Sequence, residues 1–114
     1  MITVDKLNTF GANTAEGLAR CFGNEALYLK LVATIPGEGN FDKLKDSIAA
    51  KDKKNAFEAA HALKGVLGNL SLTPIYTPIV EITELLRSES DMNYKSLLDT
   101  ILEKKDELGK LCAD

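Results

Sequence analysis

The apolar residues of this chain recur at three- and four-residue intervals almost from end to end. Valine and isoleucine, which favour strands, occur singly within these intervals and not in alternating runs. Such spacing places apolar side chains on one face of a helix, and glycine, proline and capping residues interrupt it at regular points. The pattern therefore predicts an all-α fold: an up-and-down antiparallel four-helix bundle with additional short N-terminal helices.

The boundaries of these helices follow from capping and breaking residues. Short helices are expected within residues 3–22, with Thr3 capping the first and Asn13 or Thr14 capping the second. The bundle helices are expected at about residues 25–35, 41–50, 53–71 and 74–111, the last segment as two helices split near residues 89–91. Their predicted N-caps are Asn24, Asp52, Thr73 and Asp91. We expect residues 1–114 to form a single domain.

The segment 25–35 carries apolar residues on two adjacent stripes. Leu27 and Leu31 line the predicted apolar face, with Tyr28 and Val32 beside it.

Charge and hydropathy exclude several classes of partner. The 14 basic and 17 acidic residues give a net charge of −3, and the basic residues are spread along the chain, whereas nucleic acid requires a clustered basic face. No stretch reaches the roughly 18 consecutive apolar residues of a membrane span, and the N-terminus lacks the apolar region of a signal peptide. We therefore expect a cytoplasmic protein without nucleic-acid or membrane partners. Cys21 and Cys112 are expected to be reduced, although the sequence also permits a disulfide between them.

The chain contains a single histidine, His61, and two cysteines, too few ligands for a zinc finger. A Ser-His-Asp triad would have to use His61. A helical metal-ligand pair or a general-base site at His61 is disfavoured, because no Asp, Glu or Cys follows it by three or four residues. The nearby carboxylate of Glu58 precedes it by three residues. We expect neither a metal nor a cofactor on this chain.

A helical wheel of residues 53–71 places His61 on a stripe about 100° from the core-facing side chains. The core-facing residues are Ala60, Leu63, Leu67 and Leu70, and the second stripe holds His61, Lys64, Gly65, Gly68 and Leu72. Each glycine in a helix interior costs about 1 kcal/mol relative to alanine. The position of Gly65 and Gly68 on the stripe of His61 indicates that larger side chains are excluded beside the histidine, so that a bulky partner can reach the imidazole. The simpler alternative is a surface histidine beside a tight helix crossing.

This segment resembles a known family. His61-Ala62-Leu63-Lys64-Gly65, followed by Gly68-Asn69, is similar to the signature of histidine-containing phosphotransfer (HPt) domains. The resemblance covers nearly the whole chain, because the segment Gly23–Tyr28 resembles the first bundle helix of the family, and Leu85-Leu86 lies where its fourth helix packs. Two positions depart from the family pattern: Asn69 replaces a frequent Ser or Thr, and Ser71 replaces a common glycine.

The resemblance implies a phosphocarrier, a phosphorelay intermediate in two-component signalling. His61 would accept and donate a phosphoryl group, Lys64 would stabilise its charge, and Gly65 and Gly68 would let a partner's active site close over the ring. The implied partners are response-regulator receiver domains and a sensor or hybrid histidine kinase, with Mg²⁺ supplied only by the receiver. The protein itself is expected to be a monomer. Further binding residues are expected at Asn69, Phe57 and Leu72, with Leu18 or Phe22 at the border.

The chain shows no sign of kinase activity of its own, because the segment Pro36-Gly37-Glu38-Gly39 lacks the Lys-Ser/Thr of a phosphate-binding loop. The alternative function is a non-catalytic helical-bundle module that binds a partner without chemistry.

Overall fold

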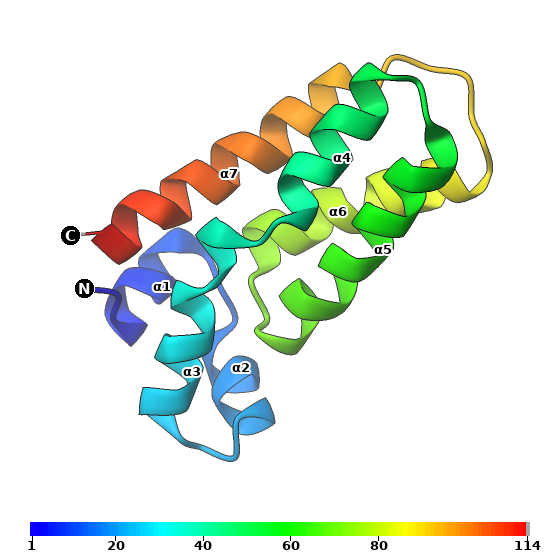
Figure 1. The fold of residues 1–114 in the computed structure, drawn as a ribbon. Helices are drawn as coiled ribbons and strands as arrows, with labels where there is room; N and C mark the ends of the chain where they lie inside the picture. The colour runs from blue at the N-terminus through cyan, green and yellow to red at the C-terminus, as the bar shows by residue number, and fades with distance from the viewer. Residues whose placement is uncertain (114) are drawn as a thin grey trace.

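The computed structural model describes residues 1–113, which form seven α-helices and one short 3₁₀ helix (Figure 1). The elements are α1 (Val4–Phe10), α2 (Thr14–Arg20), α3 (Glu25–Ala33), η1 (Ile35–Gly37), α4 (Asn40–Ala49), α5 (Lys53–Asn69), α6 (Thr73–Arg87) and α7 (Lys95–Ala113). No strand occurs among the described residues. The prediction of an all-α fold is confirmed.

Helices α4 to α7 form an antiparallel four-helix bundle (Figure 1). Helix α5 packs against both α4 and α6, and α6 packs against α7. The ammonium of Lys105 on α7 lies 5.8 Å from the centroid of the Phe41 ring on α4, so the first and last helices of the bundle are also neighbours. Helices α1, α2 and α3 lie together at one end of the bundle, and both chain termini lie at that end (Figure 1).

The core-facing stripe predicted for α5 is confirmed. Ala60 and Leu67 are fully buried, Leu63 is 1% exposed, and Leu70 is 4% exposed. These side chains contribute to a continuous core, whose apolar members come from the bundle helices and from α1 and α3. Because α5 packs against both α4 and α6, it is a firm support for the side chains on its outer face.

Four of the predicted N-caps are confirmed by hydrogen bonds from backbone amides three residues later. The caps are Thr3 (3.1 Å from the amide of Lys6), Asn13 (3.2 Å from Glu16), Asn24 (3.0 Å from Leu27) and Asp52 (3.1 Å from Asn55). Each accepted bond satisfies an amide that the helix leaves unpaired.

Two predicted caps are wrong. Thr73 is already the first residue of α6, and Leu72 occupies the cap position without a side-chain hydrogen bond. Asp91 lies ahead of α7 and accepts a 2.7 Å hydrogen bond from the ammonium of Lys53 instead. The amide at the start of α7 donates to the side chain of Asn93 at 2.9 Å. The loop after α6 therefore extends further than its capping residues suggested.

The predicted face of α3 is also wrong. Tyr28 and Val32 are fully buried, whereas Leu27 and Leu31 are 37% and 39% exposed. Helix α3 is apolar around most of its circumference, so its periodicity does not select one face. Tyr28 packs closely against Gly17 of α2, and this contact places the Tyr28 face of α3 in the interior.

The two cysteines are free thiols, Cys21 buried and Cys112 partly buried. Burial raises the pKa of the Cys112 thiol. Within residues 1–113, no helix combines the length and apolar character needed to cross a membrane.

Candidate functional site

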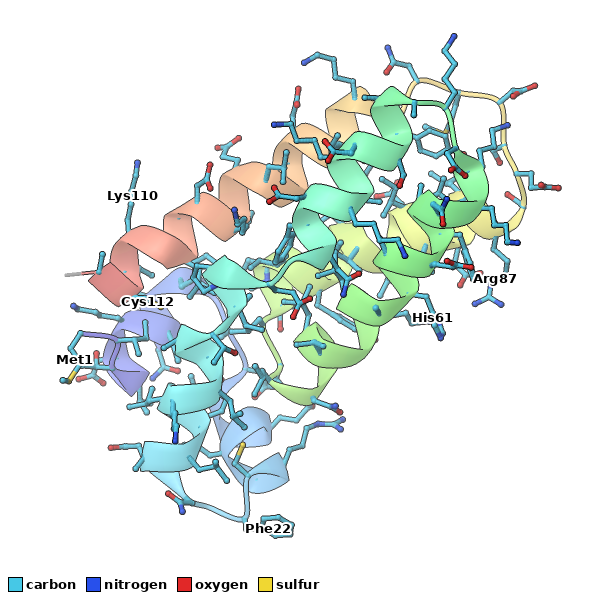
Figure 2. The ribbon with its side chains drawn as sticks, viewed as in Figure 1. Met1, Phe22, His61, Arg87, Lys110 and Cys112 are labelled. Atoms are coloured by element: carbon cyan, nitrogen blue, oxygen red, sulfur yellow. The ribbon has the colours of Figure 1, made fainter. Side chains whose placement is uncertain are left out.

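His61 lies near the middle of α5, and its side chain is exposed, as predicted. Figure 2 shows the imidazole directed away from the bundle, on the same side as Arg87. The ring stacks on Phe57, one turn earlier on α5, with centroids 5.8 Å apart and planes inclined by 17°. The guanidinium carbon of Arg87, from α6, lies 5.2 Å from the centroid of the Phe57 ring. The side of His61 toward the start of α5 is therefore covered by large side chains.

On the opposite side of His61, toward the end of α5, a cleft of about 570 Å³ opens to solvent; we call it the His61 cleft. Its lining residues are Asn13, Glu16, Arg20, His61, Lys64, Gly65, Gly68, Asn69, Ser71, Thr73, Tyr76 and Thr77. They come from α5, from Ser71 in the turn after it, from the start of α6, and from α2 with the residue before it. The cleft therefore joins the histidine to an N-terminal helix distant in sequence.

Lys64 is half-buried and lines the His61 cleft, one turn after the histidine. Within the described part of the chain its ammonium forms no ion pair. An unpaired cation in this position is available to an anionic group that approaches or is attached to the imidazole.

The two glycines of the predicted stripe have different surroundings. A Cβ at Gly65 would meet no atom within 4 Å, so packing within the fold does not require glycine there. A Cβ at Gly68 would lie 3.0 Å from Cε1 of Tyr76, so this glycine makes room for a side chain of α6. The interpretation that a glycine keeps a path to His61 open therefore applies to Gly65 and not to Gly68.

Ser71 stands where the HPt family commonly has glycine, and it adopts the conformation that glycine favours. Its φ is +54°, the left-handed conformation that glycine adopts most easily. Its amide donates to the carbonyl of Gly68, and the next amide, of Leu72, donates to the carbonyl of Leu67 at 3.1 Å. This pair of bonds is the Schellman arrangement that ends a helix. Serine thus fills the role of glycine at the end of α5 and adds a hydroxyl group.

That hydroxyl group attaches α2 to the end of α5. The Ser71 Oγ donates a 2.8 Å hydrogen bond to Oε1 of Glu16, and the Ser71 carbonyl accepts a 3.0 Å bond from the amide of Asn13. Tyr28 of α3 donates its hydroxyl to the carbonyl of Leu70 at 2.9 Å. Three hydrogen bonds therefore hold the N-terminal helices on the turn that follows the histidine helix.

The structure brings most of the predicted site residues together. His61, Lys64, Gly65, Gly68 and Asn69 line one cleft, and Phe57 stacks on the histidine. Leu72 was predicted on the same stripe, and this is wrong: its side chain is fully buried. Helix α5 ends at Asn69, so helical periodicity does not apply to Leu72, and the left-handed turn at Ser71 directs this next residue into the core.

The suggested border residues lie outside the cleft. Leu18 is half-buried against the core, and Phe22 is 94% exposed at the turn between α2 and α3 (Figure 2). Sequence reasoning missed the residues that α2 and its cap do contribute, which are Asn13, Glu16 and Arg20. The one signal for them was Ser71, a hydrogen-bonding residue at a position where the resembling family commonly has glycine.

Among residues 1–113, no group of three or more His, Cys, Asp or Glu side chains is arranged to hold a metal ion. The His61 cleft presents the exposed imidazole of His61 and the ammonium of Lys64, with open space at Gly65.

Comparison with known families assigns the chain. The family model described as "Hpt domain" matches residues 37–113, more than half of the sequence. The matched part contains α4 to α7 and the whole histidine segment, and it leaves out α1, α2 and α3. No curated protein and no solved structure compared with the chain matches it. The family match, the helical bundle and the exposed histidine on α5 agree, and the chain belongs to the Hpt domain family.

Proposed function

We propose that this protein is a phosphorelay intermediate that carries a phosphoryl group on His61. At the family level, the Hpt domain implies histidine phosphotransfer with receiver domains and histidine kinases. The observation that carries the proposal for this chain is the surroundings of His61. The imidazole is exposed on a rigid helix, beside the unpaired Lys64 and the open position at Gly65.

In the proposed step, a nitrogen lone pair of the imidazole attacks the phosphorus of an aspartyl phosphate on a receiver domain. The N–P bond forms while the P–O bond to the aspartate breaks, and the carboxylate leaves with the bonding electrons. Transfer to a second receiver reverses these changes. Phosphoryl transfer depends mainly on positioning and charge stabilisation. Lys64 supplies a cation on this side, and the receiver supplies Mg²⁺ and its own acidic groups.

Stacking on Phe57 serves the positioning requirement. A flat aromatic neighbour restricts the orientation of the imidazole without using either ring nitrogen. The nitrogens therefore stay free for attack on phosphorus. The protein acts here as a carrier and contributes no kinase activity of its own.

The test is labelling by a radiolabelled phosphorylated receiver in the presence of Mg²⁺. We expect an acid-labile, alkali-stable phosphoryl group on the wild-type protein and none on His61→Gln. Because His61 is the only histidine, a phosphohistidine has one possible position. Circular dichroism of the variant provides the folding control, since an exposed side chain contributes little to stability.

Two results would contradict the proposal. Labelling that survives in His61→Gln would place the phosphoryl group elsewhere. Absence of transfer from every receiver of the same genome would favour the alternative, a helical-bundle interaction module without chemistry.

Lys64→Ala is expected to slow labelling while the protein remains folded, because the ammonium of Lys64 forms no ion pair within residues 1–113.

A further inference from the structure

Helix α2 lies outside the part of the chain matched by the family model, yet it lines the His61 cleft. Figure 1 shows it beside the end of α5, where the chain turns toward α6. Asn13, Glu16 and Arg20 contribute to the same cleft surface as His61 and Lys64. The surface that a partner meets around the histidine is therefore larger than the matched bundle.

The position of α2 is well determined by its contacts. Glu16 and Asn13 are hydrogen-bonded to Ser71, and Gly17 faces the ring of the buried Tyr28 so closely that a Cβ would lie 2.5 Å from Cε1. The hydroxyl of Tyr28 is itself bonded to Leu70. Side chains on the outer face of α2 consequently have a defined place relative to α5.

The charges along the cleft favour an anionic partner. Its formally charged residues are Glu16, Arg20 and Lys64. The carboxylate of Glu16 is already engaged, by the hydroxyl of Ser71 at 2.8 Å and by Nε of Arg20 at 3.6 Å. The two cations and the one carboxylate give the cleft lining a net formal charge of +1, in a protein whose net charge is −3. Such a local positive potential attracts acidic surfaces and speeds their docking.

We propose that α2 is part of the receiver-binding surface and that Arg20 attracts acidic side chains of the receiver domain as it docks over His61. The inference rests on the proposed function and adds to it a recognition element outside the matched bundle. Arg20 is 51% exposed in its side chain, so a docking domain can reach it.

Arg20 and Lys64 lie at different distances from His61, and we assign them different roles for this reason. Its partner Glu16 is attached at Ser71, beyond the end of α5, and His61 lies eight residues before that end, or about 12 Å along the helix. Lys64 is one turn from the imidazole and serves the phosphoryl group. Arg20 is a docking residue and acts on the surface of the partner.

The experiment compares Arg20→Gln with the matched control Lys45→Gln, using the phosphorylated receiver that labels His61. Lys45 is exposed on α4, outside the cleft, and its loss changes the net charge equally. Transfer rates are measured against receiver concentration at low and high salt. We expect Arg20→Gln to raise the half-saturating receiver concentration about threefold to tenfold at low salt, with little difference at high salt. The maximal rate should stay within about twofold, and Arg20→Lys should restore most of the affinity.

Any of three results in the transfer assay would overturn the inference: unchanged half-saturation in Arg20→Gln, an equal change in Lys45→Gln, or a loss confined to the maximal rate. A faster hydrolysis of the phosphohistidine in isolated Arg20→Gln would also overturn it, since Arg20 would then act on the phosphoryl group. Wild-type protein that accepts no phosphoryl group would defeat the proposed function and this inference with it. Normal wild-type labelling with an unaltered Arg20→Gln would defeat this inference alone.

Discussion

Two glycines lie inside helices for opposite reasons: Gly17 at the contact between α2 and α3, and Gly65 on the exposed face of α5. At Gly17 a Cβ would lie 2.5 Å from the ring of Tyr28, so the contact between the helices excludes any side chain. At Gly65 a Cβ would meet nothing within 4 Å. The glycine of α2 is needed by the fold. Gly65 lowers the helix propensity of α5 and is not required by packing, as expected if it keeps the proposed approach to His61 open.

The largest expected effect is that of Gly17→Ala. Tyr28 cannot move aside easily, because it is fully buried and its hydroxyl is bonded to Leu70. Overpacking of this kind costs typically 1–3 kcal/mol, so we expect the free energy of unfolding to fall by about that amount in urea titrations. A variant as stable as the wild type would show that the contact relaxes, and that α2 is less firmly placed than its hydrogen bonds indicate.

The next effect concerns transfer and not stability. Gly65→Leu places a side chain in the open space beside His61, and we expect phosphotransfer from a receiver to slow about tenfold, a barrier increase of about 1.4 kcal/mol. Ala49→Leu, on the exposed end of α4, is the control for an added surface leucine. Gly65→Leu should unfold at or above the wild-type urea concentration, since leucine favours helices over glycine, and Ala49→Leu should unfold close to it, since leucine has nearly the helix propensity of alanine. Unchanged transfer in Gly65→Leu would leave this glycine without a function.

Tyr28→Phe tests the hydrogen bond from α3 to the end of α5. Removal of the hydroxyl leaves the carbonyl of Leu70 without its 2.9 Å donor, and we expect a loss of about 1 kcal/mol at pH 7. The helices should remain in place, because the ring that faces Gly17 is kept. Thermal unfolding of the variant beside the wild type measures the loss.

The same residue gives a pH dependence. Burial, and secondarily the charge of Cys21, raise the pKa of Tyr28 above its ordinary value of 10.0. In the unfolded chain the phenol loses its proton first, so above about pH 10 the folded state binds more protons and stability declines with rising pH. Below that pH the contribution of Tyr28 is fully present. Tyr28→Phe should make the alkaline decline shallower, and an identical decline in both proteins would assign it to other groups.

The smallest expected effect distinguishes the two glycines of α5. Gly65→Ala should stabilise the protein by up to about 1 kcal/mol, because helix propensity improves and no clash arises. Gly68→Ala gains the same propensity but places a Cβ 3.0 Å from Tyr76, so its gain should be smaller or negative. Urea titrations of the two variants in parallel measure the difference. Equal gains would mean that Tyr76 moves freely.

The prediction from sequence succeeded where contacts are local. The caps Thr3, Asn13, Asn24 and Asp52 each bond an amide three residues away, a distance that sequence pattern describes directly. The prediction failed for Asp91, whose side chain bonds Lys53, 38 residues earlier. It also failed for α3, which is apolar around most of its circumference, so that tertiary contacts bury Tyr28 and leave Leu27 exposed; Tyr28 faces Gly17 and donates a hydrogen bond to Leu70.

The candidate site divides in the same way. Helical spacing alone places His61, Lys64 and Gly65 on one helix face, because residues three and four apart on a helix are neighbours. The burial of Leu72 and the position of Glu16 and Arg20 along the same cleft depend instead on how the helices pack together. The bond from Ser71 to Glu16 spans 55 residues. Helical periodicity carries no information over such a separation, and the packing of α2 and α3 on the end of α5 supplies it.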